Sequence, residues 1–197
     1  GVVGAVNEEQ EELLAEIERA GQSMLEQIEL SLDMYKMETG TFVLEAQRID
    51  LARIVAGVAD MLAGMAAARG VALGVAADAP VFAMGNALLC QTIAANLLKN
   101  AVEAEHAGGR VDVRVEAHDG GARLTVANPT PVPQEIVPVF FEKYATAGKK
   151  GGSGLGAYSA RLMTRCQHGD IRLETDAESG TRLEVFLPGA APRPRDQ

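Results

Sequence analysis

The longest uninterrupted helical pattern in the chain sets the first limit on how it can fold. Residues 7 to 38 contain no proline and one interior glycine, which predicts a single long helix. Its apolar residues recur at three- and four-residue steps in two adjacent stripes: Leu14, Ile17, Met24, Ile28 and Tyr35 in the first, and Leu25 and Leu32 in the second. Stripes of this combined width are typical of a helix that contacts two neighbours, as in a four-helix bundle. One helix cannot bury such a surface alone, so it needs a partner chain, a further segment or the face of the next domain.

The remainder of the sequence alternates shorter helices and strands. Apolar spacing, helix caps and glycines predict strands at 42–49, 71–75, 81–84, 111–117, 122–127, 170–175 and 181–187, and helices at 50–69, 86–105 and 153–167. The strands read as hairpins without a βαβ alternation, which favours an α+β layer. The proline- and arginine-rich residues 190–197 are expected to be a disordered tail.

Composition excludes several classes of function. The net charge of −9 makes the chain poorly suited to gripping nucleic acid or an anionic membrane, and five Phe, three Tyr and no Trp leave few side chains for base stacking. We expect Cys90 and Cys166 to be buried thiols of a reducing compartment. No signal peptide is recognised, and no apolar run is expected to approach the roughly 18 residues that span a bilayer. These features predict a cytoplasmic piece that does not contact the membrane directly.

Two asparagines mark the predicted helix at 86–105. Asn96 and Asn100 are one turn apart and share a face, with Lys99 beside them. The amide oxygen of asparagine is a hard, neutral ligand, and Mg²⁺ usually takes one or two protein oxygens and completes its shell with phosphates and water. The alternative is that both amides only bond to neighbouring loops.

A glycine-rich segment precedes the last predicted helix. Lys149 to Gly156 reads Lys-Lys-Gly-Gly-Ser-Gly-Leu-Gly, and glycines next to a helix N-terminus allow the backbone to approach a phosphate. A flexible, solvated loop would have the same composition. The segment also fits the dinucleotide pattern G-x-G-x-x-G/A, but no buried strand precedes it, and the P-loop pattern is absent.

The asparagine motif, the glycine motif and Gly180-Thr181 in this order resemble the catalytic, ATP-binding domain of sensor histidine kinases. These two-component proteins belong to the superfamily of gyrase, the ATP-dependent chaperone and mismatch-repair ATPases. Residues 96–104 resemble the family's N-box, Phe140 to Tyr144 its F-box at the start of a mobile lid, and Gly152 to Gly156 its G2 box. The resemblance implies a two-layer α/β sandwich with a mixed, largely antiparallel sheet under helices, preceded by the one long helix.

The resemblance also assigns roles to individual residues. It implies that Asn100 ligates Mg²⁺, that Asn96 and Lys99 hold the metal-phosphate end, and that Thr181 supports the adenine pocket. Lys149 would contact phosphate from the lid. The full set of implied nucleotide-binding residues is Asn96, Lys99, Asn100, Asn128, Tyr144, Lys149, Gly152, Gly154, Leu155, Gly156 and Thr181. ATP and Mg²⁺ are the implied cofactors. Hydrolysing relatives have a glutamate at the place of Asn96 that activates water, a task that asparagine cannot perform.

The sequence departs from the family pattern at the G1 box. There the family has approximately Asp-x-Gly-x-Gly, and its Asp receives the adenine amino group. Residues 128–133 instead read Asn-Pro-Thr-Pro-Val-Pro. Asn128 can still accept through its amide oxygen, but the bond is neutral, worth about 0.5–1.5 instead of about 1.5–3 kcal/mol. The prolines make this loop stiffer.

The phospho-acceptor histidine of the family is the second departure. His106, His118 and His168 all lack the expected context, and none falls in the long helix. We therefore expect a fragment in which residues 1–40 are the second helix of the dimerisation hairpin, residues 41–189 are the catalytic domain, and the first helix with its histidine lies outside the chain.

Three functions remain open from the sequence. The first is transfer of the ATP γ-phosphate to that outside histidine, for relay to the receiver domain of a response regulator, by a kinase that forms homodimers through the long helix. The second is a degenerate, non-catalytic signalling module with weak or no nucleotide binding. The third is a serine/threonine kinase of the same superfamily. Whether the full-length protein is anchored in a membrane is left open.

Overall fold

The computed structural model describes residues 7–77, 79–146 and 154–189. The chain forms two compact units, residues 1–42 and 43–197, and each is described by itself. Lys149, Gly152 and the expected tail at 190–197 lie outside the described residues.

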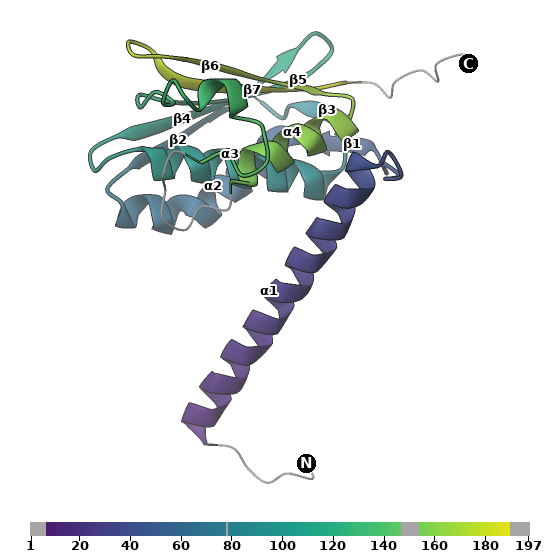
Figure 1. Cartoon of the computed structure of the whole chain (residues 1–197), viewed down its shortest axis with the longest axis vertical. Coiled ribbons are helices and arrows are strands. Elements are labelled where there is room, and N and C mark those ends of the chain that lie inside the picture. The colour runs from purple at the N-terminus through teal and green to yellow at the C-terminus, as the bar shows by residue number, and fades with distance from the viewer. Residues whose placement is uncertain (1–6, 78, 147–153, 190–197) are drawn as a thin grey trace. The chain divides into compact units, whose positions relative to one another are not determined.

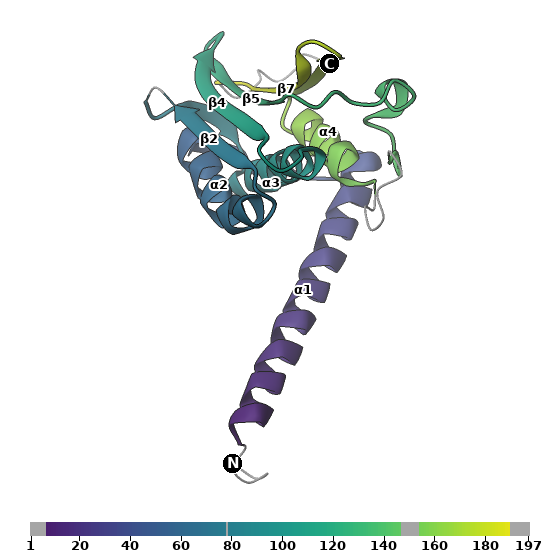
Figure 2. The same cartoon turned by 90° about the vertical axis from the view of Figure 1, so that its left-hand side faces the viewer.

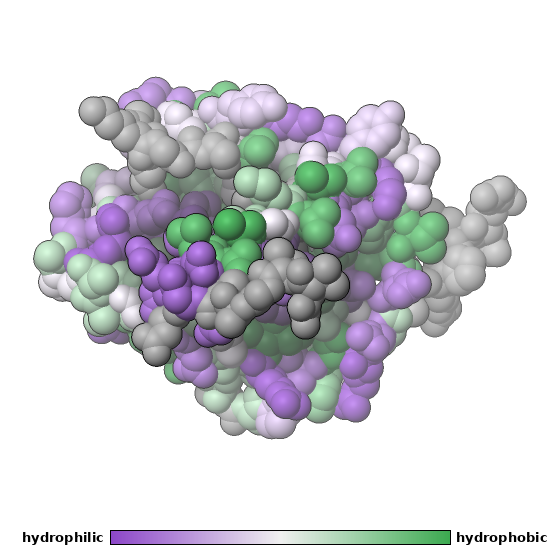
Figure 3. Space-filling model, turned by 90° about the horizontal axis from the view of Figure 1, so that it is seen from below, coloured by the Kyte–Doolittle hydropathy of each residue, from purple (hydrophilic) through white to green (hydrophobic). Residues whose placement is uncertain are grey.

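The first unit contains the long helix α1 (Glu8–Glu38). It begins with a reciprocal cap, in which Asn7 Oδ1 accepts from the Gln10 N–H at 2.8 Å and Gln10 Oε1 accepts from the Asn7 N–H at 3.0 Å. Gly40, at φ +70°, follows the helix and permits the left-handed turn that ends it. The residues of both predicted stripes are exposed: Leu14, Ile17, Met24, Leu25, Ile28, Leu32 and Tyr35. In Figure 3, a space-filling view of the whole chain from below, hydrophobic residues (green) are exposed among hydrophilic ones (purple).

The second unit is built on a five-stranded sheet with the order β2-β4-β5-β7-β6. Its strands are β2 (Ala72–Ala77), β4 (Arg110–His118), β5 (Gly121–Asn128), β6 (Asp170–Asp176) and β7 (Gly180–Leu187). β2 pairs with β4 in parallel, and the other neighbours are antiparallel. Two short strands, β1 (Gln47–Asp50) and β3 (Phe82–Gly85), form a separate antiparallel pair.

Three helices cover one face of the five-stranded sheet: α2 (Leu51–Ala68), α3 (Ala87–Ala104) and α4 (Gly156–Cys166) (Figures 1 and 2). α3 packs against both α2 and α4 and against the sheet. Its residues Ile93, Ala94, Leu97, Leu98 and Val102 are at most 1% exposed and form the centre of the core. A 3₁₀ turn, η1 (Val137–Val139), lies between β5 and α4. The predicted fold class, helices on one face of a mixed, largely antiparallel sheet, is confirmed.

The helix starts follow the caps that the sequence predicts. Asp50 Oδ1 accepts from the Arg53 N–H at 3.2 Å, and Asn86 Oδ1 accepts from the N–H groups of Leu88 and Leu89. Gln167 joins the end of α4 to the start of α3, because its Oε1 accepts from the Asn86 N–H at 2.8 Å. These bonds fix where α3 starts, and hence which of its faces meets α4.

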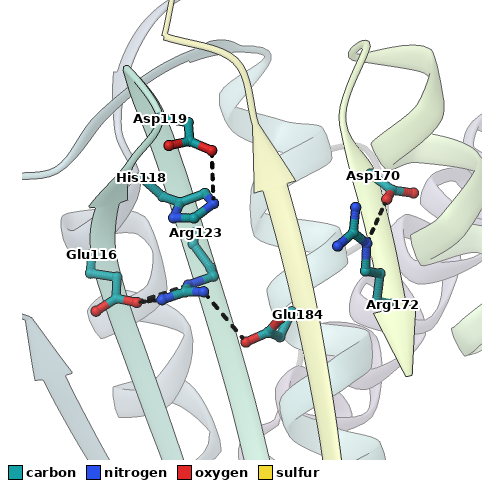
Figure 4. Close-up of polar contacts among 7 residues, drawn as sticks. All are labelled: Glu116, His118, Asp119, Arg123, Asp170, Arg172 and Glu184. Carbon is teal, nitrogen blue, oxygen red and sulfur yellow. Dashed lines mark hydrogen bonds and ion pairs between the residues drawn. The ribbon is translucent and has the colours of Figure 1, made fainter. Parts of the chain in front are cut away.

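The face of the sheet opposite the helices carries charged pairs (Figure 4). Arg123 on β5 lies between Glu116 on β4 and Glu184 on β7, and Arg172 pairs with Asp170 within β6. His118 faces Asp119 at the β4–β5 turn with 3.3 Å between Nε2 and Oδ2. Cross-strand ion pairs of this kind stabilise a half-exposed sheet face modestly.

Three expectations about the elements were wrong. No strand spans residues 42–46, because Gln47 pairs with Gly85 and the next partner, Asn86, already caps α3. A parallel crossover does occur, since β2 and β4 are joined through β3 and α3. Cys90 is buried, but Cys166, the last residue of α4, is only half-buried.

α2 also contradicts the expectation that no segment is long and apolar enough to cross a bilayer. It has 18 residues and passes that test by length and composition. Its residues Leu51, Ala52, Val55, Val58, Ala59 and Ala66 are buried within the second unit. A core helix of a folded domain passes the same test, so α2 is weak evidence for a membrane span.

Candidate nucleotide-binding site

The predicted N-box asparagines lie where α3 faces α4. Asn96 and Asn100 are both half-buried, while Leu97 and Leu98 between them are fully buried. Burial of the two leucines fixes the rotation of α3 about its axis. The amides are thereby held at the edge of the core, next to the first turn of α4.

Asn96 is oriented by a serine on α4. Its Nδ2 donates to Ser159 Oγ at 3.0 Å, and the Ser159 hydroxyl donates its own hydrogen to the Gly156 carbonyl oxygen at 3.0 Å. Ser159 is 3% exposed. Because the amide NH₂ group is turned toward Ser159, the amide oxygen of Asn96 remains free to accept another bond.

Gly156 allows the backbone of α4 to approach both asparagines. A Cβ atom at this position would lie 3.3 Å from Nδ2 of Asn100 and 3.7 Å from Oδ1 of Asn96. Among the described residues, no side chain or backbone group forms a hydrogen bond with the amide of Asn100. Asn100 thus presents a half-buried, unpaired amide beside the glycine turn.

Lys99 lies outside this contact. Its Nζ is 3.9 Å from Glu103 Oε1 one helical turn away, and 57% of its side chain is exposed. A surface pair at this distance contributes little to stability. The ammonium group can therefore leave Glu103 for a stronger anion at small cost.

Tyr144 and Gly154 are joined across the residues between the F-box and the G2 box. The Tyr144 N–H donates to the Gly154 carbonyl oxygen at 3.0 Å. Gly154 has φ +66°, and a Cβ there would collide with the backbone of Tyr144, so only glycine fits. Leu155 is the N-cap residue of α4, and within the described part of the chain no side chain caps this helix start.

The F-box packs on α4 through its aromatic and charged side chains. Phe140 and Phe141 stack edge to face, 5.0 Å apart. Arg161 lies 5.5 Å from the centre of the Phe141 ring, and Lys143 lies 5.1 Å from that of Tyr158. These contacts connect the segment after η1 to the helix that carries Gly156.

Asn128 and Thr181 form a second group at the edge of the same unit. They are register partners at the end of β5 and the start of β7, and both are 6% exposed. Gly180, at φ +75°, lies against the backbone of Asn128 and Pro129, where a Cβ would collide. This close approach brings β7 against the loop that begins at Pro129.

Two threonine hydroxyls of the sheet form hydrogen bonds with that loop, and the donor of each bond can be assigned. The Thr181 hydroxyl donates to the Thr130 carbonyl oxygen at 2.8 Å, so its single hydrogen is used. The 3.2 Å contact between the hydroxyls of Thr175 and Thr181 must then be donated by Thr175, whose oxygen accepts from the Val132 N–H at 2.9 Å. Thr181 therefore acts on the loop conformation.

A buried carboxylate completes the second group. Glu105, the C-cap residue of α3, is 7% exposed, and its Oε1 accepts from Asn128 Nδ2 and from the Thr130 N–H, both at 2.9 Å. Burial by itself would raise the pKa of Glu105. The hydrogen bonds from Asn128 and Thr130 and the charge of His106 outweigh this effect of burial, so the pKa of Glu105 lies below its usual value. Glu105 is therefore ionised at neutral pH.

One protein family matches the part of the chain that holds both groups. The family described as histidine kinase-, DNA gyrase B-, and HSP90-like ATPase matches residues 85–191, more than half of the chain. The chain belongs to this family. The matched residues, 85–191, include both groups of site residues described above.

Sensor kinases are among its relatives. Sensor protein CutS of Streptomyces coelicolor is 33% identical over 153 residues, which cover 74% of this chain and 37% of that protein. Sensor histidine kinase TmoS of Ectopseudomonas mendocina is 25% identical over 183 residues, covering 89% of this chain and 19% of that protein. The chain thus spans well under half the length of these relatives, and it is the histidine kinase ATPase domain of a sensor kinase.

Solved structures share the fold. The crystal structure of full-length ShkA in complex with AMPPNP has a TM-score of 0.72 at 21% identity, covering 95% of this chain and 41% of that one. The nucleotide-free catalytic domain of histidine kinase ThkA has a TM-score of 0.66 at 21% identity, covering 74% of this chain and 96% of that one.

The ATPase domain brings most of the predicted residues into two groups and leaves a few outside them. Asn96, Asn100 and Gly156 meet where α3 faces the first turn of α4, and Asn128 and Thr181 meet where β5 ends and β7 begins. Lys99 is exposed beside the first group. Three further residues were missed by the sequence analysis: Ser159, Thr130 and Glu105. Only Ser159 had a usable signal, since it lies one turn after Gly156 on the helix that follows the G2 box.

His106 and His168 are exposed, His118 is half-buried, and all three lie near element ends. The described part of the chain contains no group of three His, Cys, Asp or Glu side chains that could hold a metal ion.

Proposed function

We propose that this ATPase domain binds ATP and transfers its γ-phosphate to a histidine outside the chain, for relay to the receiver domain of a response regulator. The observation that carries the proposal is the meeting of Asn100, Asn96 and Gly156. Two separate stretches of sequence converge there on the half-buried amide of Asn100, which has no hydrogen-bond partner among the described residues, and on Gly156, where a Cβ would lie 3.3 Å from that amide.

The base would lie at the second group. Asn128 Nδ2 already donates to two acceptors, so its Oδ1 is the atom left to accept the adenine amino hydrogen. Thr181 supports this end by holding the carbonyl of Thr130. The loop of Pro129, Pro131 and Pro133 replaces the flexible glycines of the family, and its bonds to Thr175 and Thr181 keep it in one place.

The phosphates would lie at the first group. Backbone N–H groups at the start of α4 are suited to anionic oxygens: those of Gly154, Leu155 and Gly156. Lys99 would add positive charge, and Lys149 and Gly152 would contribute from the segment before Gly154. Mg²⁺ fits the donor set, because the Asn100 oxygen is a hard ligand and the remaining ligands would be phosphates and water. When bound, the ion neutralises phosphate charge, while Tyr144, bonded to Gly154, closes this end.

Transfer is favoured over hydrolysis by the residue at position 96. Asparagine cannot take a proton from water, and its NH₂ group is occupied by Ser159. In the proposed step, the bond between the γ-phosphorus and the bridging oxygen breaks, ADP leaves, and a phosphorus–nitrogen bond forms with the outside imidazole. The domain contributes positioning and charge stabilisation.

Partners and location follow from the same proposal. Residues 1–40 would be the second helix of a dimerisation hairpin and residues 41–189 the catalytic domain, so the protein would pair with itself through α1. The net charge of −9 argues against nucleic acid as a partner and against direct contact of this piece with a membrane. We place the domain in the cytoplasm.

Calorimetric titration of ATP, with and without Mg²⁺, tests the proposal. Saturable binding that strengthens with Mg²⁺ is the expected result. A degenerate signalling module, which the altered G1 segment favours, would give no heat of binding under either condition, and that outcome would rule out the kinase function.

A further inference from the structure

The carboxylate of Glu105 sets the orientation of the Asn128 amide. Both neighbours of the amide NH₂ group are obligate acceptors: Glu105 Oε1 at 2.9 Å and the Thr130 carbonyl oxygen at 3.1 Å. The alternative orientation would turn Asn128 Oδ1 toward these two oxygens and lose both bonds. Glu105 and Thr130 therefore hold the NH₂ group of Asn128 on their side and leave its Oδ1 pointing away from them.

The carboxylate itself is held firmly in place. The Thr130 N–H donates to the same Oε1 at 2.9 Å, and Gly109 leaves room for Oε2, where a Cβ would collide. Glu105 also ends α3, five residues after Asn100. The helix that carries the metal-binding amide thus also positions the group that orients the base-binding amide.

This arrangement matters because an asparagine, unlike an aspartate, can present either a donor or an acceptor. Adenine carries an amino group at position 6, whereas hypoxanthine carries a carbonyl oxygen there. An Asn128 free to rotate could bond to both bases. An Asn128 held by Glu105 offers only its oxygen, which attracts the amino group and repels the carbonyl.

We propose that Glu105 is a positioning residue that makes Asn128 selective for a 6-amino purine. The inference rests on the proposed function, since it requires that Asn128 face the base. It also explains why asparagine suits this position: an aspartate would bring a second carboxylate against Glu105, with repulsion in a buried setting.

Binding of ATP and ITP, which differ at position 6 of the base, tests the proposal. We would titrate both nucleotides with Mg²⁺ into the parent chain, Glu105→Gln, and the control Glu174→Gln, an exposed glutamate on β6. The parent and control are expected to prefer ATP. The Thr130 N–H keeps the glutamine oxygen at the same place, but a neutral oxygen holds the Asn128 amide less strongly than a carboxylate. In Glu105→Gln the ratio of ATP to ITP affinity should therefore fall by about 3- to 10-fold. Combining Glu105→Gln with Asn128→Asp should restore the preference, because a carboxylate at 128 can only accept.

The outcomes separate this inference from the function on which it rests. Parent binding of ATP without preference over ITP would overturn the inference and leave nucleotide binding standing. An equal loss of both affinities in Glu105→Gln would make Glu105 merely structural. No ATP binding by the parent would overturn both. Nuclear magnetic resonance of the Asn128 side chain adds a nucleotide-free test: its NH₂ hydrogens should exchange slowly in the parent and faster in Glu105→Gln, and fast exchange in the parent would contradict the proposed orientation.

Discussion

Asn100 is the side chain on which the metal-dependent part of nucleotide binding should depend. If its oxygen ligates Mg²⁺, Asn100→Ala should weaken Mg-ATP binding by about 5- to 150-fold, or on the order of 1–3 kcal/mol, and change metal-free ATP binding much less. Calorimetry at several Mg²⁺ concentrations measures both. Gln91→Ala, an exposed amide on the same helix, is the matched control. An unchanged Mg-ATP affinity in Asn100→Ala would remove the N-box assignment.

Gly156 offers a second test at the same end of the site. A Cβ here would lie 3.3 Å from the Asn100 amide, tighter than ordinary van der Waals contact, so Gly156→Ala should reduce ATP affinity while the domain stays folded. Gly64→Ala is the control, because nothing lies within 4 Å of a Cβ at that helical position. It should leave binding unchanged and raise stability by about 0.5–1 kcal/mol. Equal ATP affinity in both variants would show that Gly156 does not face the nucleotide.

At the scale of elements, Gln167 joins α4 to α3. It is 1% exposed, its Oε1 accepts from the Asn86 N–H at 2.8 Å, and its Nε2 donates to the Met163 carbonyl oxygen at 3.2 Å. Gln167→Ala would leave the Asn86 N–H without its partner and should lower the free energy of unfolding by about 1–3 kcal/mol. Urea unfolding measures this loss, with exposed Gln134→Ala as a control that should change stability by less than about 0.5 kcal/mol. A similar small change in Gln167→Ala would mean that water replaces the bond.

Cys90 also lies at this junction, because its Sγ donates to Gln167 Oε1 at 3.4 Å, and it predicts a pH dependence of stability. Burial raises the pKa of the Cys90 thiol to about 12, whereas in the unfolded chain it should ionise near its ordinary value of about 8.5. A raised folded pKa means that this contribution is fully present below the unfolded pKa and is lost as pH rises toward the folded one. Between pH 7 and pH 10 the parent should lose about 2 kcal/mol more than Cys90→Ala in urea unfolding. Equal losses would contradict a neutral buried thiol.

Elements with local signals were predictable from the sequence, and those set by distant partners were not. Asp50 and Asn86 cap helices through bonds to residues three or fewer positions away, so the helix starts could be read directly. Residues 42–46 alternate like a strand but have no strand to pair with, because β3 ends at Gly85, the partner of Gln47. The end of β3 could not be read from residues 42–46 themselves. Asn128 was identified by resemblance, while its orientation depends on Glu105, 23 positions earlier in the chain.

At the scale of the molecule, α1 should mediate self-association. Large apolar residues along its length are more than half exposed, including Ile17 at 61% and Ile28 at 57%, and monomers rarely leave such surfaces uncovered. Sedimentation should show a mass that rises with concentration, and Ile28→Glu should shift the equilibrium toward monomer. A matched change on the second unit, Val75→Glu at the edge strand β2, should leave the association unchanged. A parent that stays monomeric up to millimolar concentration would rule out this role.

The chain should not phosphorylate itself. None of its three histidines lies on α1, so the proposed acceptor is absent from the sequence. Incubation with γ-labelled ATP and Mg²⁺ is expected to leave no acid-labile label on the protein. Label at His106, His118 or His168 would place the acceptor within this domain and contradict the proposed division of roles.

The pairing of β5 with β7 gives the two ends of the site different freedom to change during evolution. Seven residue pairs hold these strands in register and set Asn128 opposite Thr181, so an insertion within either strand would misplace the base-binding end. Gly154 and Leu155, at the phosphate-binding end, follow instead the segment that connects β5 to α4. Loop closure entropy grows slowly, by about 0.6 kcal/mol for each doubling of length, so that segment can lengthen or shorten without disturbing the sheet. Relatives should accordingly differ in length after Val132, the last loop residue bonded to the sheet, far more than they differ in the spacing of the strands around Asn128.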